Sequence, residues 1–207
     1  MTDLTLYSMP SSGNSYKVRL LLALTQRSYT HIGLEYETPE LADARTAHRL
    51  PLNKLPVLEL SDGTQIPESN AILFYLADGT NFLPQDPILS AKCLAWMFWE
   101  QNQHEGVIAV RAALLTYAQR KHLATPARLA ELLDQGTALL SQMEAHLARQ
   151  DWFVGTGPTI ADLSLYAYTH SAETKGGFDL SVFPAICRWL DRIAALPGYV
   201  ALDDVPA

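Results

Sequence analysis

The segment NKLPVLEL, residues 53–60, has a proline directly before a short apolar stretch with the pattern of a β-strand. Proline is tolerated there because its missing N–H falls outside the hydrogen-bond ladder of the strand 57–60. If the Leu55–Pro56 peptide bond is cis, the turn presents the Leu55 backbone as a strand-like edge for a peptide ligand. Lys54 by itself indicates only a surface charge. The segment therefore predicts a strand and, on the condition of a cis bond, an edge beside it that can pair with a peptide.

This strand lies within a regular alternation of strands and helices that ends near residue 80. A strand, a helix and a second strand come first, which predicts a parallel pair joined by a right-handed crossover. Asp62-Gly63 then predicts a hairpin turn, and a helix follows the hairpin. The order β-α-β and then β-β-α is that of a thioredoxin-like domain over residues 1–80. The expected elements are strand 4–8, helix 15–24, strand 29–34, strands 57–60 and 65–66, and helix 69–77.

The rest of the chain follows a different pattern. Residues 84–87, Pro-Gln-Asp-Pro, indicate a linker or its end, and no strand pattern follows them. Apolar residues recur instead at the spacing of helices that bury one face. We expect four such helices, over 88–117, 126–149, 159–171 and 183–195. The fold class is therefore α/β plus all-α, in which the thioredoxin-like N-terminal domain is followed by an all-helical C-terminal domain over residues 88–207.

The loop MPSSGNSYK, residues 9–17, joins the first strand to the first helix. Free backbone N–H groups and the positive end of the helix dipole favour an anion at such a position. A serine hydroxyl in the loop can also donate a hydrogen bond to a thiolate. Serine, glycine and asparagine equally form turns and N-caps, so the loop alone leaves both interpretations open.

Two further segments contain helix-start patterns. In PESNAIL, residues 67–73, Ser69 is placed to cap a helix. Its hydroxyl and N–H groups can instead hold a carboxylate, while Glu68 accepts an amino group. In TIADL, residues 159–163, Thr-x-x-Asp before an apolar run is a variant of the capping box. We interpret Asp162 as a folding residue that starts a buried helix, not as a catalyst.

The composition excludes several functional classes. The 207 residues include 15 Lys and Arg against 22 Asp and Glu, a net charge of −7, which gives no electrostatic footprint for nucleic acid or an anionic membrane. No apolar stretch is long enough to span a bilayer. Cys93 and Cys187 lie far apart and outside metal-ligand spacing, which predicts no metal site and fits a reducing cytoplasm. We expect a cytoplasmic protein in which any anionic ligand is held by a local site.

Together, these segments resemble the cytosolic glutathione transferase family, in its serine-type and bacterial members, across nearly the whole chain. SSGNSYKVRLLL resembles the loop and first helix of those members, and NKLPVLEL resembles the family segment with its cis-proline. PESNAILFYLA is similar to the glutathione-binding turn, and TIADLSLYAY is similar to a helix-start motif of the second domain. One departure is that Asn53 stands where the family has glycine. Asparagine tolerates the left-handed backbone that glycine would supply in this turn.

The resemblance implies a role for each segment in the binding of glutathione as a co-substrate. The backbone of Leu55, beside Pro56, is expected to pair with the cysteinyl part of glutathione, with Lys54 near the ligand. Glu68 and Ser69 are expected to hold the γ-glutamyl end.

The resemblance also places the catalytic hydroxyl at Ser12, counted back from Lys17 in the first helix. Ser11, one residue away, is the alternative, and Asn14 together with Ser12 matches some bacterial disulfide-reducing members. Tyr7 is expected to pack within its strand, which argues against a tyrosine-type mechanism. No cysteine occupies this loop, which argues against the cysteine-type classes.

The activity implied by the resemblance is glutathione transfer, in which an activated thiolate attacks a small hydrophobic electrophile without a metal. A cytoplasmic homodimer that serves detoxification is expected. The helical domain is expected to form the pocket for the second substrate, with His104, Val107 and Arg111 facing it. The alternative interpretations place His104 on the helix surface and Arg111 in solvent or in an ion pair. Two competing functions are glutathione-dependent reduction of disulfides or peroxides, and a non-catalytic role in ligand binding or assembly.

Overall fold

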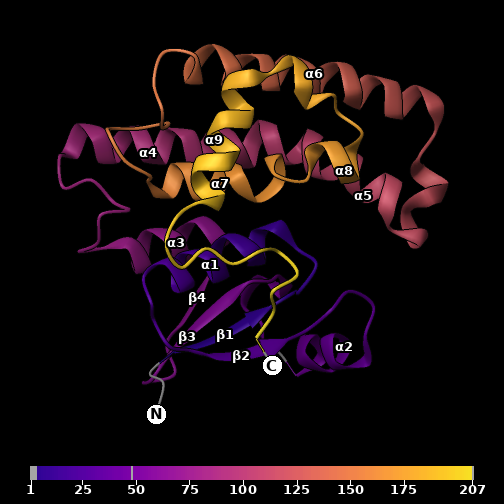
Figure 1. The fold of residues 1–207 in the computed structure, drawn as a ribbon. Helices are drawn as coiled ribbons and strands as arrows, with labels where there is room; N and C mark the ends of the chain where they lie inside the picture. The colour runs from indigo at the N-terminus through magenta and orange to yellow at the C-terminus, as the bar shows by residue number, and fades with distance from the viewer. Residues whose placement is uncertain (1–3, 48, 207) are drawn as a thin grey trace. The chain divides into compact units, whose positions relative to one another are not determined.

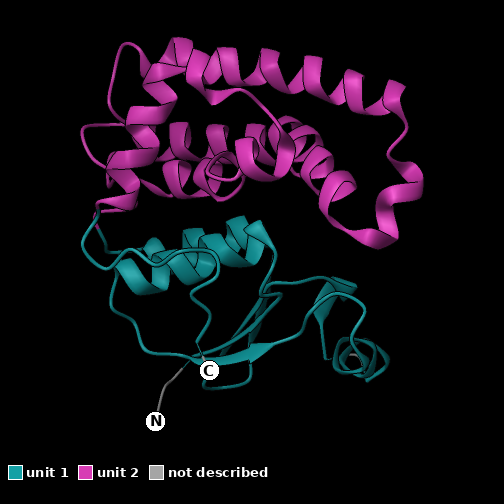
Figure 2. Cartoon of the chain, turned by 45° about the vertical axis from the view of Figure 1, so that its right-hand side comes forward, with its two compact units in different colours: residues 1–80, 196–207 teal, residues 81–195 magenta. Residues whose placement is uncertain are grey.

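The computed structural model describes residues 4–47 and 49–206 and divides into two compact units. The first unit runs to Thr80 and also includes the segment from Leu196 onward, and the second unit covers Asn81–Ala195 (Figure 2). The sheet belongs to the first unit, and helices make up the second. The predicted fold class, a thioredoxin-like domain followed by a helical domain, is confirmed.

A four-stranded sheet with the order β2-β1-β3-β4 forms the centre of the first unit (Figure 1). β1 pairs in parallel with β2, while β3 pairs antiparallel with both β1 and β4. The parallel pair and the hairpin are those that the sequence predicted. The strands are β1 (Leu4–Ser8), β2 (Thr30–Gly33), β3 (Val57–Leu60) and β4 (Gln65–Pro67).

Two helices of this unit, α1 (Gly13–Leu24) and α3 (Ser69–Ala77), pack against each other and cover the sheet (Figure 1). Ile72, Leu73 and Leu76, which form the predicted apolar face of α3, are fully buried. Burial of each such side chain stabilises the fold by about 1.5–3 kcal/mol. The starts of both helices are thereby fixed relative to the strands that precede them.

The helix α2 (Pro39–Thr46) is absent from the sequence prediction. It is short and polar, and only Leu41 and Ala44 are buried, so no sustained apolar period marks it. The Thr38 hydroxyl caps the helix by accepting a hydrogen bond from the Leu41 N–H at 3.3 Å. The two buried side chains join a hydrophobic cluster that includes Val57 at the start of β3. Tertiary packing therefore stabilises a helix that local pattern does not reveal.

The second unit contains the four predicted helical regions, with an interruption in the first of them. That region consists of α4 (Pro87–Trp99), a π-helical segment (Glu100–Ala109) and α5 (Val110–Thr116). Such π-helical turns are rare and leave no distinct apolar pattern in the sequence. Within the described residues, no helix has the length and apolarity that a bilayer span requires. The other helices are α6 (Pro126–Leu147), α7 (Ile160–Thr169), the unpredicted short α8 (Ala172–Gly176) and α9 (Pro184–Ala194).

Asp162, in the first turn of α7, links three parts of the helical unit. Its carboxylate accepts from the Thr159 N–H and hydroxyl, both at 2.9 Å, which completes the predicted capping box. The same carboxylate accepts from the Phe153 N–H and from Trp189 Nε1–H, both at 3.0 Å. Full burial raises the pKa of Asp162 to about 6, although these hydrogen bonds act in the opposite direction. Asp162 therefore stabilises the helical unit, and the sequence pattern predicted such a folding role.

The end of the chain departs from the predicted domain boundary. The sequence predicts that residues 88–207 form the helical domain, but the last part of this range, from Leu196, belongs to the first unit. The Tyr16 hydroxyl donates to Val200 O at 2.9 Å, and Arg19 donates to Leu202 O at 2.9 Å. These bonds join residues 184 and 183 positions apart, so no local pattern indicates them.

We expect Asp162→Ala to lower the free energy of unfolding by at least about 3 kcal/mol, because several buried donors lose their acceptor at about 1–3 kcal/mol each. Asp86→Ala is the matched control. Asp86 caps α4 by accepting from the Ile88 and Leu89 N–H groups but is exposed, so its loss should cost about 0.5–2 kcal/mol. Chemical denaturation measures both values. Equal losses in the two variants would contradict the role of the buried carboxylate.

The stability of the protein should also depend on pH through Asp162. Its pKa is raised to about 6, from an ordinary value of about 4, so the folded state holds this proton more tightly than the unfolded state. The stability that the proton contributes is complete below about pH 4 and is lost as the pH rises through about 6. Across this pH range the free energy of unfolding of the parent protein should therefore fall. Asp162→Ala, which has no carboxyl group at this position, should not show this part of the fall. Denaturation curves at intervals across the range measure it, and a pH-independent difference between the two proteins would refute it.

Candidate functional site

The register of three neighbouring strands brings the predicted segments together. Tyr7, near the end of β1, pairs with Val57 at the start of β3, and Val57 also pairs with Pro67 at the end of β4. The loop after β1, the proline before β3 and the first residues of α3 therefore meet at one end of the sheet. In the part of the chain that the structure describes, no cluster of three or more His, Cys, Asp or Glu side chains is arranged to hold a metal.

The Leu55–Pro56 peptide bond is cis. The turn before it contains Leu52 and Asn53 at φ 59° and 54°, so Asn53 adopts the left-handed backbone that asparagine was expected to tolerate there. Pro56 is buried, whereas Lys54 is exposed. The Leu55 backbone borders the end of the sheet, in the position where an extended peptide can pair with it.

The two serines of the loop have different surroundings. The Ser11 hydroxyl donates to Glu35 Oε1 at 2.7 Å, and the Ser11 N–H donates to Glu35 Oε2 at 3.0 Å. Ser12 occupies the N-cap position of α1, yet its side chain makes no capping hydrogen bond. Its hydroxyl is partly exposed and has no hydrogen-bond partner within residues 4–47 and 49–206. A hydroxyl donor is therefore available at the positive end of a helix.

The start of α3 is not capped by the residue predicted to cap it. Glu68 occupies the N-cap position with φ 69° and ψ 115°, and its side chain makes no capping hydrogen bond. The Ser69 hydroxyl donates instead to Asn14 Oδ1 at 3.2 Å, so the capping interpretation of Ser69 is wrong. A positive φ at a non-glycine residue costs about 1–3 kcal/mol, and such strain concentrates at functional sites. The N-terminus of α3 thus has the features of an anion-binding site.

Two hydrogen bonds join the first turns of α1 and α3. Besides the bond from Ser69 to Asn14, Lys17 Nζ donates to Asn70 Oδ1 at 3.2 Å. Lys17 is fully buried, so its positive charge is held between the starts of the two helices. This charge and the two helix dipoles act in the same direction and favour a bound anion, although the net charge of the protein is −7.

Two of the residues expected to face a second substrate are engaged inside the helical unit. His104 is fully buried, and its Nε2 is hydrogen-bonded to the Thr169 hydroxyl at 3.0 Å. Arg111 Nε donates to Gly176 O at 2.6 Å, and the guanidinium carbon lies 5.7 Å from the centre of the Phe178 ring. The full burial of His104 contradicts the alternative that placed it on the helix surface, whereas Arg111 is only half-buried. That His104 and Arg111 face a second substrate stays a prediction.

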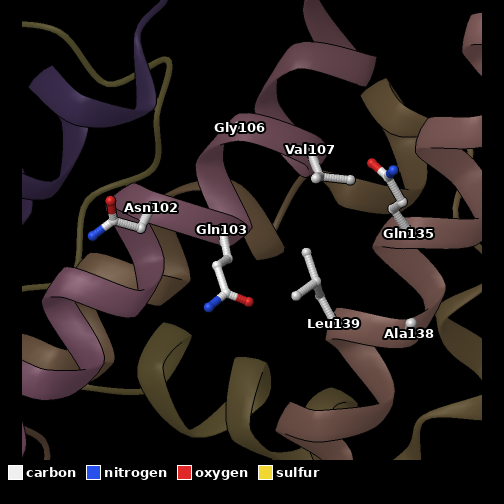
Figure 3. A pocket seen from close by; sticks show the side chains of 7 residues that line it. All are labelled: Asn102, Gln103, Gly106, Val107, Gln135, Ala138 and Leu139. Atoms are coloured by element: carbon white, nitrogen blue, oxygen red, sulfur yellow. The ribbon is translucent and has the colours of Figure 1, made fainter.

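The third of these residues, Val107, lines a cavity of about 400 Å³ in the helical unit (Figure 3). Val107 and Leu139 supply apolar wall, and the amides of Asn102, Gln103 and Gln135 border it. The lining comes from the π-helical segment on one side and from α6 on the other (Figure 3). A cavity of this size fits a small organic molecule.

Two residues that shape the loop are missing from the sequence analysis. Glu35 binds Ser11, and Arg19 NH2 donates to Pro10 O at 3.0 Å. Glu35 follows β2, and its bond to Ser11 spans 24 positions, so no local motif indicates it. Arg19 lies within the apolar run VRLLL, where a cation at the surface is not expected. This is the one feature of the sequence that could have identified Arg19 as a buried residue.

Comparisons with known proteins match both units. The family model described as the N-terminal domain of glutathione S-transferase matches residues 2–78, and the C-terminal domain model matches residues 107–197. A solved glutathione S-transferase of Xanthobacter autotrophicus Py2 is 41% identical with a TM-score of 0.88, and 96% of each chain is covered. One from Pseudomonas fluorescens Pf-5 is 39% identical with a TM-score of 0.91, covering 98% of this chain and 100% of the other. The disulfide-bond oxidoreductase YfcG of Escherichia coli K12 is 27% identical over 209 residues, covering 93% of this chain and 91% of that protein.

Proposed function

Because this chain belongs to the glutathione S-transferase family, we propose that it binds glutathione in its first unit and activates the thiol for attack on small electrophiles. The observation that carries the proposal is the Ser12 hydroxyl, which lies at the N-terminus of α1 without a hydrogen-bond partner among the described residues. The neighbouring Ser11 hydroxyl is bound to Glu35. This difference supports Ser12 over Ser11 as the donor to the glutathione sulfur.

The other site residues hold the tripeptide by its backbone and its charged end. The Leu55 backbone, beside the cis-proline, pairs with the cysteinyl part. The N–H groups at the start of α3 bind the γ-glutamyl carboxylate, and the Ser69 hydroxyl exchanges its bond to Asn14 for this carboxylate. The Glu68 carboxylate accepts from the γ-glutamyl amino group. Lys54 is exposed next to Leu55 and lies near the ligand.

The proposed donor can supply enough stabilisation of the thiolate to lower the thiol pKa. A glutathione thiol with a cysteine-like pKa of roughly 8.5 is only a few per cent ionised at neutral pH, and the thiolate is the nucleophile. Lowering this pKa by about 2 units requires about 2.7 kcal/mol of differential stabilisation. One charge-assisted hydrogen bond supplies about 1.5–3 kcal/mol, and a helix N-terminus supplies about 0.3–1 kcal/mol. Ser12 and α1 together can therefore keep the thiol mostly ionised.

In the proposed reaction Ser12 donates a hydrogen bond and keeps its own proton. The thiol proton passes to solvent, the sulfur electron pair forms a bond to the electrophilic carbon, and the leaving group departs with its electron pair. The helical unit supplies the pocket for the apolar part of the electrophile, and the cavity beside Val107 has a suitable volume of about 400 Å³. The active form is proposed to be a twofold homodimer in the cytoplasm, as is usual in the family.

Glutathione-dependent disulfide reduction is the second candidate function. Asn14 lies in the first turn of α1, two positions after the N-cap Ser12, and its side chain accepts a hydrogen bond from Ser69 at 3.2 Å. The similarity to a disulfide-bond oxidoreductase also favours this reaction, in which the thiolate attacks a disulfide sulfur. A non-catalytic ligand-binding role is the third candidate and predicts glutathione binding without turnover.

Ser12→Ala should lower kcat/KM for conjugation of chlorodinitrobenzene near pH 7 by about 10- to 100-fold, the rate equivalent of one charge-assisted hydrogen bond. Much of this loss should disappear at high pH, where thiolate forms without the donor. Ser11→Ala is the matched comparison: it removes the neighbouring hydroxyl but keeps the hydrogen bond from the Ser11 N–H to Glu35, so it should lower kcat/KM much less than Ser12→Ala. The pH profile of kcat/KM for the three proteins provides the measurement, and a profile of Ser12→Ala that matches the parent would refute the assignment.

The same proteins, together with Asn14→Ala, separate the three functions when they are also assayed with hydroxyethyl disulfide. A disulfide reaction that depends on Asn14 more than on Ser12 would identify the reductase function. Glutathione binding without turnover of either substrate would leave only the non-catalytic role.

Glu68→Ala and Ser69→Ala should raise the KM for glutathione and leave kcat near the parent value. These groups hold the unreactive end of glutathione equally in the ground and transition states. Glu40→Ala is the control, because Glu40 is likewise an exposed carboxylate at the start of a helix in the same unit. Calorimetric titration with glutathione gives the affinities, and an unchanged affinity in both site variants would remove the γ-glutamyl assignment.

A further inference from the structure

Arg19 is a buried cation bonded to the loop that contains Ser12. It is 1% exposed, and its NH2 nitrogen donates to Pro10 O at 3.0 Å and to Leu202 O at 2.9 Å. Its NH1 nitrogen donates to the Ser8 hydroxyl at 3.4 Å. Within the described residues it makes no ion pair, so neutral acceptors hold a full positive charge, which a guanidinium retains.

A single nitrogen of this guanidinium joins two distant parts of the chain. Pro10 precedes Ser12 by two positions, and Leu202 lies in the C-terminal segment, residues 196–206. The two hydrogens of the nitrogen point in fixed directions in the guanidinium plane, so both carbonyls must stay in place for both bonds to form. The position of the loop backbone is therefore coupled to the position of the C-terminal segment.

The C-terminal segment is attached to α1 independently of Arg19. The Tyr16 hydroxyl donates to Val200 O at 2.9 Å. Gly198 adopts φ +87°, and a Cβ at this position would lie 3.1 Å from Ala23 O in α1. Glycine alone combines this backbone conformation with so close an approach. The segment thus lies directly on the helix that begins at the proposed site.

The loop is also held through Ser11, whose N–H and hydroxyl both donate to Glu35. Arg19 fixes the carbonyl of Pro10, and Glu35 fixes the next residue. Ser12 follows directly, so these two anchors restrict the backbone that carries its hydroxyl. Orientation matters because a donor stabilises a developing or resident negative charge only when it is aimed at it.

We infer that Arg19 is a positioning residue for Ser12, and that the C-terminal segment is a functional part of the site because its Leu202 carbonyl holds Arg19 against the loop. The inference rests on the proposed function and adds a structural requirement to it, which is that the C-terminal segment stays in place. Arg19 acts through Pro10 and contacts no reacting atom. Displacement of the C-terminal segment weakens the hydrogen bond from Ser12 to the glutathione sulfur.

The test is the pKa of the thiol in the glutathione complex, followed by thiolate ultraviolet absorbance against pH at saturating glutathione. Arg19→Met and Gly198→Val should each raise this pKa by about 1 unit, which is a tenfold change in the ionisation constant. The KM for glutathione should stay near the parent value, because the γ-glutamyl end is held at α3. A merely structural role would lower Tm without changing the thiol pKa of the folded complex.

Two further variants separate the possible causes. Gly63→Val is the control for backbone strain, because Gly63 has φ +83° but no described atom within 4 Å of a Cβ, so it should lose stability and keep the parent thiol pKa. Arg19→Lys keeps the buried charge but lacks the planar fork that reaches both carbonyls, so it should also raise the thiol pKa.

The outcomes distinguish the inference from the function on which it rests. A parent-like thiol pKa in Arg19→Lys, or in Gly198→Val, would overturn the inference, and these variants decide the matter if Arg19→Met does not fold. A parent complex in which the thiol titrates like free glutathione would instead overturn the proposed function, before any variant is compared.

Discussion

The antiparallel pairing of β1 with β3 is the constraint on which the first unit depends. Leu6 pairs with Leu58 in this register, and both side chains are fully buried. A slip of one residue would turn this apolar pair to the opposite face of the sheet, so burial specifies the register strongly. The same register places the loop after Ser8 beside the cis-proline and, through β4, beside the start of α3. The position of the candidate site therefore follows from the strand register that buries this apolar pair.

Local electrostatics explain how an acidic protein can hold an anionic ligand at this place. Two helix N-termini meet there, and Lys17 and Arg19 add buried positive charges on α1. Lys17 Nζ donates to the amide oxygen of Asn70, and Arg19 donates to the backbone carbonyls of Pro10 and Leu202, so both cations are fixed in place on α1. Charges in a buried, low-dielectric region act more strongly than exposed charges of equal number. The net charge of −7 is therefore a poor guide to this site.

The sequence predicted the features that depend on local pattern. β1, β3 and α3 begin and end at the predicted residues, because each combines an apolar period with clear turn residues on either side. Ser69 shows the limit of this reasoning. A serine at a helix start predicts a cap, but its partner is Asn14, which is 55 positions away. Glu35 and the C-terminal segment were missed for the same reason, since bonds across 24 and 183 positions leave no periodicity in the sequence.

A crystal structure of the glutathione complex tests the central claim most directly, because it shows which group donates to the sulfur. The account predicts Ser12 Oγ within hydrogen-bond distance of the sulfur, with Ser11 still bound to Glu35 and the γ-glutamyl carboxylate at the N-terminus of α3. A sulfur whose nearest donor is Ser11 or Asn14, with the Ser12 hydroxyl turned away from the ligand, would contradict it.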